Sequence, residues 1–281
     1  MINYPNINPD FINICGITIK WYGVCHVIAF LLFYWRATVT KPIDFTKDQL
    51  ADLLFYVCLG VLFGGRIGYI VFYMSSEVFS DPLTMLKFWL PGRSFHGGLL
   101  GVIIAMYCYH KLKKQNFWKI ADFIAPIIPL GIAFGRIGNF INGELWGRVT
   151  TVSWGMIFPY VDDLPRHPSQ IYEFLLEGVL LFIILNFIFN LKIFNKNYYF
   201  SSRLNKIFKN LFKNKSAWFL IFYAIFRILV ENYREPDIEL GLIKGLTMGQ
   251  ILSIPMLLIG GFLLWLRVRN LIIKENNAAI H

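Results

Sequence analysis

The sequence predicts an all-α, polytopic membrane protein that forms one integral membrane domain over residues 1–281. Its composition is the first indication, because 56% of the residues are hydrophobic and only 16% are charged, which is too apolar for a soluble domain of this length. The second is a series of apolar stretches of about 20 residues, the length at which a helix crosses a hydrocarbon core of about 30 Å. The third is that most charges lie between these stretches.

Seven transmembrane helices are predicted. The third and sixth are the shortest, but their centres hold too few charges for helices on a protein surface. No water-soluble domain is expected, because the longest connections, 142–170 and 194–216, are too short for one. The predicted spans lie at about 17–35, 52–74, 95–110, 120–141, 171–193, 217–233 and 246–267.

The distribution of positive charge predicts the orientation. Seventeen Lys and Arg residues follow spans one, three and five or lie in the tail, and seven lie in the other connections. The positive-inside rule therefore predicts an extracytoplasmic N-terminus and a cytoplasmic C-terminus. Topology also explains the net charge of +10, so no nucleic-acid partner is expected. The basic connection 194–216 is either plain topogenic charge, which we favour, or an amphipathic segment on the anionic leaflet.

The cysteines indicate neither a metal site nor a disulfide framework, because they lack CxxC spacing and fall mostly within apolar spans. No cofactor is predicted. We expect small, buried, hydrophobic side chains at Cys15, Cys25, Cys58 and Cys108.

Charged residues inside the predicted spans need a reason, since each costs about 2.5–3.5 kcal/mol on insertion scales. The four that matter here are Arg66, Arg136, Arg227 and Glu231. Tyr223 joins Arg227 and Glu231 at successive i, i+4 steps, so these three side chains share one helical stripe that is expected to face the interior. The Arg227–Glu231 pair is either a structural ion pair or, as we favour, part of a site. For Arg66 the two interpretations are balanced.

Polar residues from separate spans are predicted to lie at the same depth. Tyr22, His96, Asn139, Glu144 and Glu231 all lie toward the outer face in this topology, which is typical of one site. A helix continuing beyond Arg136 would place Asn139 and Gly143 on its face.

Arginine suggests the ligand of this site, because the planar fork of its side chain suits a phosphate. An anionic phospholipid is therefore expected. His96 is followed by glycines that are expected to leave its imidazole open to a partner, and we interpret it as a general base or a substrate-orienting group.

The main alternative is a secondary transporter, which would also surround a cavity with polar groups. Its site should lie at the bilayer midplane, whereas polar residues here gather toward one face, which favours an enzyme that draws lipid from the outer leaflet. A metal-dependent phosphatidyltransferase or an intramembrane aspartyl protease would need clustered aspartates, and a His-x4-Asp acyltransferase would need an aspartate in place of Gly101. None of these patterns appears.

The string GRIGNFINGELWG over 135–147 resembles the signature of prolipoprotein diacylglyceryl transferases. Further motifs agree with that family in order and spacing: WYG at 21–23, GRIGY at 65–69, SFHGG at 94–98, HPSQIYE at 167–173 and REPD at 234–237.

The resemblance implies an enzyme of the bacterial cytoplasmic membrane with seven transmembrane helices and an active site that faces the outer leaflet. Phosphatidylglycerol is the implied donor, the lipobox cysteine of a prolipoprotein is the acceptor, and glycerol phosphate is the by-product. We expect catalytic roles for Tyr22, His96, Arg227 and Glu231. We expect phosphatidylglycerol to be bound by Arg66, Arg136, Asn139, Glu144, Gly147 and Tyr223.

Overall fold

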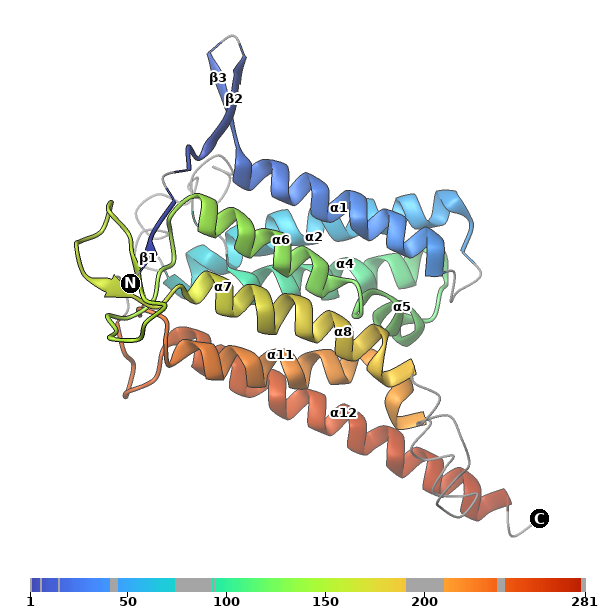
Figure 1. Ribbon diagram of the computed structural model, residues 1–281. Coiled ribbons are helices and arrows are strands. Elements are labelled where there is room, and N and C mark those ends of the chain that lie inside the picture. The colour runs from blue at the N-terminus through green and yellow to red at the C-terminus, as the bar shows by residue number, and fades with distance from the viewer. Residues whose placement is uncertain are drawn as a thin grey trace.

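A bundle of long helices with small β-elements at one end forms the protein (Figure 1). The computed structural model describes residues 2–5, 7–14, 16–40, 45–73, 92, 94–190, 210–236 and 241–278. Its helical elements are α1 (Trp21–Thr40), α2 (Lys47–Tyr73), α4 (Phe95–Lys113), α5 (Phe117–Ile124), α6 (Ile128–Ile141), α7 (Ser169–Glu173), the π-helix η2 (Phe174–Leu180), α8 (Leu181–Asn186), the 3-10 turn η3 (Ile188–Asn190), α11 (Lys215–Glu231) and α12 (Met248–Ala278).

The predicted class is confirmed at the level of a mostly helical, multi-pass membrane protein. In the described part of the chain, four helices are long and apolar enough to cross a bilayer, namely Trp21–Thr40, Lys47–Phe72, Ser169–Asn186 and Met248–Ile273. A bent pair, Phe117–Ile124 with Ile128–Ile141, brings the number to five if it counts as one span. The predicted third and sixth spans are helical, as α4 and α11. The count of seven and the orientation stay predictions.

The predicted span 120–141 is broken rather than continuous. Its two halves, α5 and α6, meet at an angle of 43°. Pro126 lies in the turn between them and Pro129 in the first turn of α6, and proline lacks the N–H that a helix interior requires. Asn186 on α8 donates to the Pro126 carbonyl at 2.7 Å, so the break is stabilised by a neighbouring helix.

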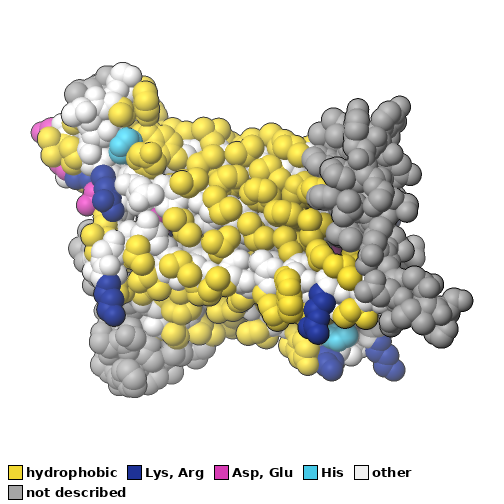
Figure 2. Space-filling model, turned by 90° about the horizontal axis from the view of Figure 1, so that it is seen from below, with side chains coloured by type: hydrophobic (Ala, Val, Ile, Leu, Met, Phe, Trp, Pro, Cys, Tyr) yellow, Lys and Arg dark blue, Asp and Glu magenta, His cyan; other side chains and the backbone are white. Residues whose placement is uncertain are grey.

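The outer surface of the bundle is apolar between two charged ends. Figure 2 shows hydrophobic side chains over the middle of one face, with Lys and Arg toward its two ends. Large hydrophobic residues are exposed on several helices, among them Leu31, Ile104 and Leu258. An apolar surface of this extent fits lipid rather than water.

Small β-elements close the end of the bundle at which α6 and α11 finish. The strand β1 (Ile2–Asn3) pairs in parallel with β4 (Met156–Ile157), which pairs antiparallel with β5 (Pro165–Arg166). A hairpin of β2 (Asp10–Ile14) and β3 (Ile17–Lys20) precedes α1. Tyr4 Oη donates to the Phe140 carbonyl at 2.7 Å, which ties this N-terminal segment to the end of α6.

Glycines bring α2 and α4 into backbone contact. A Cβ atom on Gly60 would lie 2.6 Å from the Gly101 carbonyl oxygen, and one on Gly64 would lie 2.5 Å from the Gly97 oxygen. Small residues allow this approach between membrane helices. Gly97, the first glycine after His96, takes part in this contact, since it packs against Gly64 and Gly68.

The expected burial of the cysteines is confirmed only in part. Cys25 is buried and Cys58 is half-buried, but Cys108 is exposed. It shares the outward face of α4 with Ile104, so a sequence position inside an apolar span did not distinguish lipid contact from the core. Cys15 and most of the connection 194–216 lie outside the described residues.

Candidate active site

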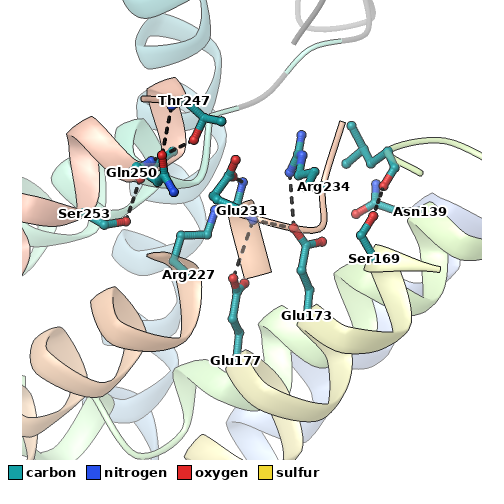
Figure 3. A network of polar contacts seen from close by, with 12 residues as sticks. Asn139, Ser169, Glu173, Glu177, Arg227, Glu231, Arg234, Thr247, Gln250 and Ser253 are labelled. Atoms are coloured by element: carbon teal, nitrogen blue, oxygen red, sulfur yellow. Dashed lines mark hydrogen bonds and ion pairs between the residues drawn. The ribbon is translucent and has the colours of Figure 1, made fainter. Parts of the chain in front are cut away.

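Three arginines and three glutamates meet inside the bundle, close to one end of it, and Figure 3 labels all of them but Arg136. We call them the Arg–Glu cluster. All six side chains are at most 12% exposed, and the two most deeply buried carboxylates are fully inaccessible. Their charges balance, as a buried ionic group requires. The members are Arg136 on α6, Glu173 on α7, Glu177 on η2, Arg227 and Glu231 on α11, and Arg234 beyond α11.

Glu173 lies at the centre of the cluster and contacts all three arginines. Its Oε2 atom is 3.0 Å from Arg136 Nε. Its Oε1 atom accepts a hydrogen bond from Arg227 Nη1 and lies 3.2 Å from Arg234 Nη1. This carboxylate therefore fixes the spacing of three guanidinium groups that would otherwise repel one another.

Glu177 and Glu231 complete the pairing. Glu177 lies 3.4 Å from Arg136 Nη2 and 3.5 Å from Arg227 Nη1. Glu231 Oε1 is 2.5 Å from Arg227 Nη2, which confirms the predicted i, i+4 pair and its inward direction. Gly249 on α12 covers this pair, because a Cβ atom there would collide with the Glu231 carboxylate and lie 3.1 Å from Arg227 Nε.

Glu173 and Glu177 lie just before and in the middle of a π-helix. Glu173 ends α7 and Glu177 lies in η2, whose i→i+5 hydrogen bonds widen the turn, a feature that is frequent at functional sites. Gly178 lets η2 approach α6 closely, since a Cβ atom there would lie 2.7 Å from Ala133 Cβ. This approach brings the glutamates within reach of Arg136.

Hydrogen bonds through Asn139 and Glu144 extend the cluster toward the end of the bundle. Arg136 Nη1 lies 3.3 Å from Asn139 Oδ1, and Asn139 Nδ2 donates to Glu144 Oε1 at 2.8 Å. The expectation that Gly143 continues the helical face of Arg136 is wrong, because α6 ends at Ile141 and Gly143 has a φ of +64°. This turn directs Glu144 back to Asn139, which a continuing helix would not do.

His96, Tyr223 and Arg227 each keep a buried polar atom without a hydrogen-bond partner among the described residues. These atoms are His96 Nε2, Tyr223 Oη and Arg227 Nε. The His96 and Tyr223 rings are 6.4 Å apart between centroids, and Phe95 stacks on Tyr223 at 4.2 Å. Buried polar groups are usually satisfied, so the unsatisfied atoms of His96 and Tyr223, whose rings are neighbours, indicate a place for a ligand.

Tyr22 on α1 lies beside the site, and Arg66 lies on α2. Tyr22 packs against α6 at Gly138, where a Cβ atom would lie 2.9 Å from Tyr22 Cδ2, next to Asn139. Arg66 is buried where α2 meets the segment before α4, and its Nη1 atom is 3.5 Å from the Gly92 carbonyl oxygen. The ion pairs of the Arg–Glu cluster do not include Arg66 among the residues that the structure describes.

Gly147 lies where three backbone segments cross. Its N–H donates to the His167 carbonyl at 2.8 Å, and a Cβ atom would lie 2.5 Å from both the His167 and the Tyr233 oxygens. The geometry gives this predicted lipid-binding residue a packing role that holds the loop after α6 against the end of α11.

Sequence reasoning missed Glu173, Glu177 and Arg234 as site residues. A signal was present for the first two, since carboxylates four residues apart inside a predicted span call for buried partners. Arg234 follows the helix and carries no such signal. Within the described ranges, no group of three or more His, Cys, Asp or Glu side chains has the geometry of a metal site.

Comparisons with known proteins agree with the resemblance noted in the sequence. The profile of the family described as prolipoprotein diacylglyceryl transferase matches residues 9–266. A relative from Legionella pneumophila, phosphatidylglycerol–prolipoprotein diacylglyceryl transferase, is 48% identical over 271 residues, which cover 94% of this chain and 99% of the relative. A relative of the same name from Coxiella burnetii is 44% identical over 276 residues, covering 96% and 99%. The chain belongs to the prolipoprotein diacylglyceryl transferase family.

Proposed function

We propose that the protein transfers the diacylglyceryl group of phosphatidylglycerol to the lipobox cysteine of prolipoproteins in the bacterial cytoplasmic membrane, the first step of lipoprotein maturation. The family and the names of its curated relatives support the reaction. One structural observation supports its location: His96 Nε2, Tyr223 Oη and Arg227 Nε are buried beside the Arg–Glu cluster without a partner among the described residues. A phosphate and an attacking thiol would supply the missing partners.

Arg136 is the arginine of the cluster best suited to receive the headgroup. Its side chain is 12% exposed, against 8% for Arg227 and 9% for Arg234. A guanidinium group carries five N–H donors, so Arg136 can keep its glutamates and still donate to a phosphate. Asn139 and Glu144, which continue from Arg136 by hydrogen bonds, would position the glycerol hydroxyls. Arg66, Gly147 and Tyr223 would shape the lipid site around them.

The nucleophile in this reaction is the thiol of the acceptor, so the enzyme contributes proton transfer and charge stabilisation. His96, assisted by Tyr22, takes the thiol proton, because the thiolate is the reactive form. The sulfur attacks the glyceryl C3 carbon, a C–S bond forms and the bond from that carbon to the phosphate oxygen breaks. Arg136 and Arg227 stabilise the charge that develops on the departing glycerol phosphate, and Glu231 orients Arg227.

The depth of the site favours a lipid enzyme over a transporter. Glu231 is the last residue of α11, His96 is the second of α4, and Asn139 is two residues before the end of α6. Tyr223 lies at the middle of α11, but a transporter site would be centred on the middle of all these helices. We propose that this end of the bundle faces the outer leaflet, as the charge distribution predicts.

The proposed reaction can be tested with purified protein, phosphatidylglycerol and a lipobox peptide. We expect glycerol phosphate release in step with a peptide mass gain of one diacylglyceryl group, and neither product when serine replaces the peptide cysteine. Glycerol phosphate release without a mass gain would indicate a lipase. Movement of the lipid across the bilayer without covalent change would indicate a transporter.

The role of His96 has a matched control on the same helix. His96→Gln should slow transfer near neutral pH and recover part of the rate toward pH 8.5, where a free thiol ionises unaided, since its pKa is about 8.5. His110→Gln, near the other end of α4, should behave like the wild type. Equal losses at every pH would argue for an orienting role of His96.

A further inference from the structure

A cavity lies at the end of the bundle opposite to the Arg–Glu cluster. Its volume is about 120 Å³, and its walls come from α5, the beginning of α11 and the C-terminal half of α12. Figure 1 places α5 and the beginning of α11 at one end and the last turn of α11 at the other. From Asn214 to Glu231 the helix rises by about 25 Å, so the cavity is a separate site.

The cavity presents hydrogen-bond donors. Asn214 lines it, is only 3% exposed, and has an Nδ2 atom that is buried without a hydrogen-bond partner among the described residues. Arg267 lines it from α12 with a side chain that is 45% exposed. Asn214 is also the N-cap of α11, and the N-terminus of a 17-residue helix carries partial positive charge. All three features favour an acceptor with negative charge.

Asp122 lies beside these donors and offsets part of their positive charge. Its Oδ1 atom accepts hydrogen bonds from the Ser216 backbone N–H at 3.0 Å and from Ser216 Oγ at 2.6 Å. Its Oδ2 atom lies 3.7 Å from Arg267 Nη2, too far for a strong hydrogen bond. Arg267 is therefore loosely held and has donors to spare.

We propose that this cavity binds a phosphate group. A phosphate has five heavy atoms, and an apolar cavity of about 150 Å³ holds the six of benzene, so the volume is sufficient. Trp118, Leu263 and Leu266 supply apolar walls beside the donors. A tryptophan and an arginine at the end of a membrane bundle are typical of headgroup depth. The phosphate belongs either to a phospholipid of the leaflet at this end or to a soluble anion.

Calorimetric titration of the full-length protein in detergent separates these sources. The probes are inorganic phosphate and dihexanoyl phosphatidic acid. Losing one charge-assisted hydrogen bond weakens binding roughly ten- to 150-fold, and we expect that increase in Kd for Arg267→Gln. Arg269→Gln is the matched control, because Arg269 lies on the same helix, stacks on Trp265 at 5.4 Å and does not line the cavity. Asn270→Ala removes a second cavity side chain without touching the core.

The Arg–Glu cluster can also bind phosphate, so a titration can contain two binding components. The component that belongs to the cavity is the one that Arg267→Gln loses and Arg269→Gln keeps. Tighter binding of the short-chain lipid in that component assigns the cavity to a phospholipid. Binding of inorganic phosphate with equal or greater affinity assigns it to a soluble anion. If Arg267→Gln and Asn270→Ala bind both probes as the wild type does, or if neither probe binds in that component, the cavity is not a phosphate site.

Discussion

Arg136 joins two possible roles, charge balance and substrate binding, and a charge-neutral double variant separates them. Its guanidinium contacts Glu173 at 3.0 Å and Glu177 at 3.4 Å. Arg136→Gln leaves the cluster with one uncompensated negative charge among carboxylates that are fully buried. Breaking a buried ion pair costs about 3–5 kcal/mol, so we expect a lower melting temperature and less folded protein from this single variant.

The double variant Arg136→Gln with Glu177→Gln restores neutrality. Glu173 keeps its contacts with Arg227 and Arg234 in that protein, so most of the melting temperature should return. Transfer should stay slow if Arg136 binds the headgroup, because one lost charge-assisted hydrogen bond costs roughly 1.5–3 kcal/mol, which is about ten- to 150-fold in rate. Arg136→Lys, which keeps the charge but loses the fork, should show a similar rate loss with near-normal stability.

Both quantities are measured on the same purified proteins: the transfer rate per folded molecule and the melting temperature. Normal transfer by the double variant would refute the reasoning, since it would show that Arg136 only balances the charge of Glu177. If Arg136→Lys is stable and fully active, paired hydrogen bonds from the Arg136 guanidinium are not needed for transfer.

Three further predictions concern packing, topology and the thiols. Gly97→Ala should lower the melting temperature strongly, because the added Cβ would collide with the Gly64 oxygen and Gly68 Cα. The control variant Gly131→Ala has open space around the added Cβ and should melt like the wild type. Equal melting temperatures of the two variants would exclude the close contact of α2 with α4 at Gly97. A reporter fused at residue 155 should read extracytoplasmic and one at residue 205 cytoplasmic, and reversal of either would place the Arg–Glu cluster at the inner leaflet. Replacing all four cysteines together should leave the transfer rate within a few-fold of wild type, since the reacting thiol comes from the substrate. Loss of activity traced to one cysteine in a folded protein would point to a covalent enzyme intermediate. The four are Cys15, Cys25, Cys58 and Cys108.

The sequence by itself determined the class of protein and half of the ionic site. Apolar length and low charge are sufficient to indicate membrane helices, because backbone groups in hydrocarbon must be satisfied within the helix. The stripe of Tyr223, Arg227 and Glu231 followed from the helical period, which depends only on local geometry. A charge within an apolar span also predicted that a partner exists.

Only the tertiary structure decided which partners meet. Glu173 and Glu177 reach Arg136 and Arg227 because η2 packs between α6 and α11, and no spacing along the chain encodes the contact of separate helices. The same limit applies to Gly97, because spacing along the chain does not predict its close contact with α2. Local periodicity fixes the direction of a side chain from its own helix, whereas its neighbour depends on how several helices pack at once.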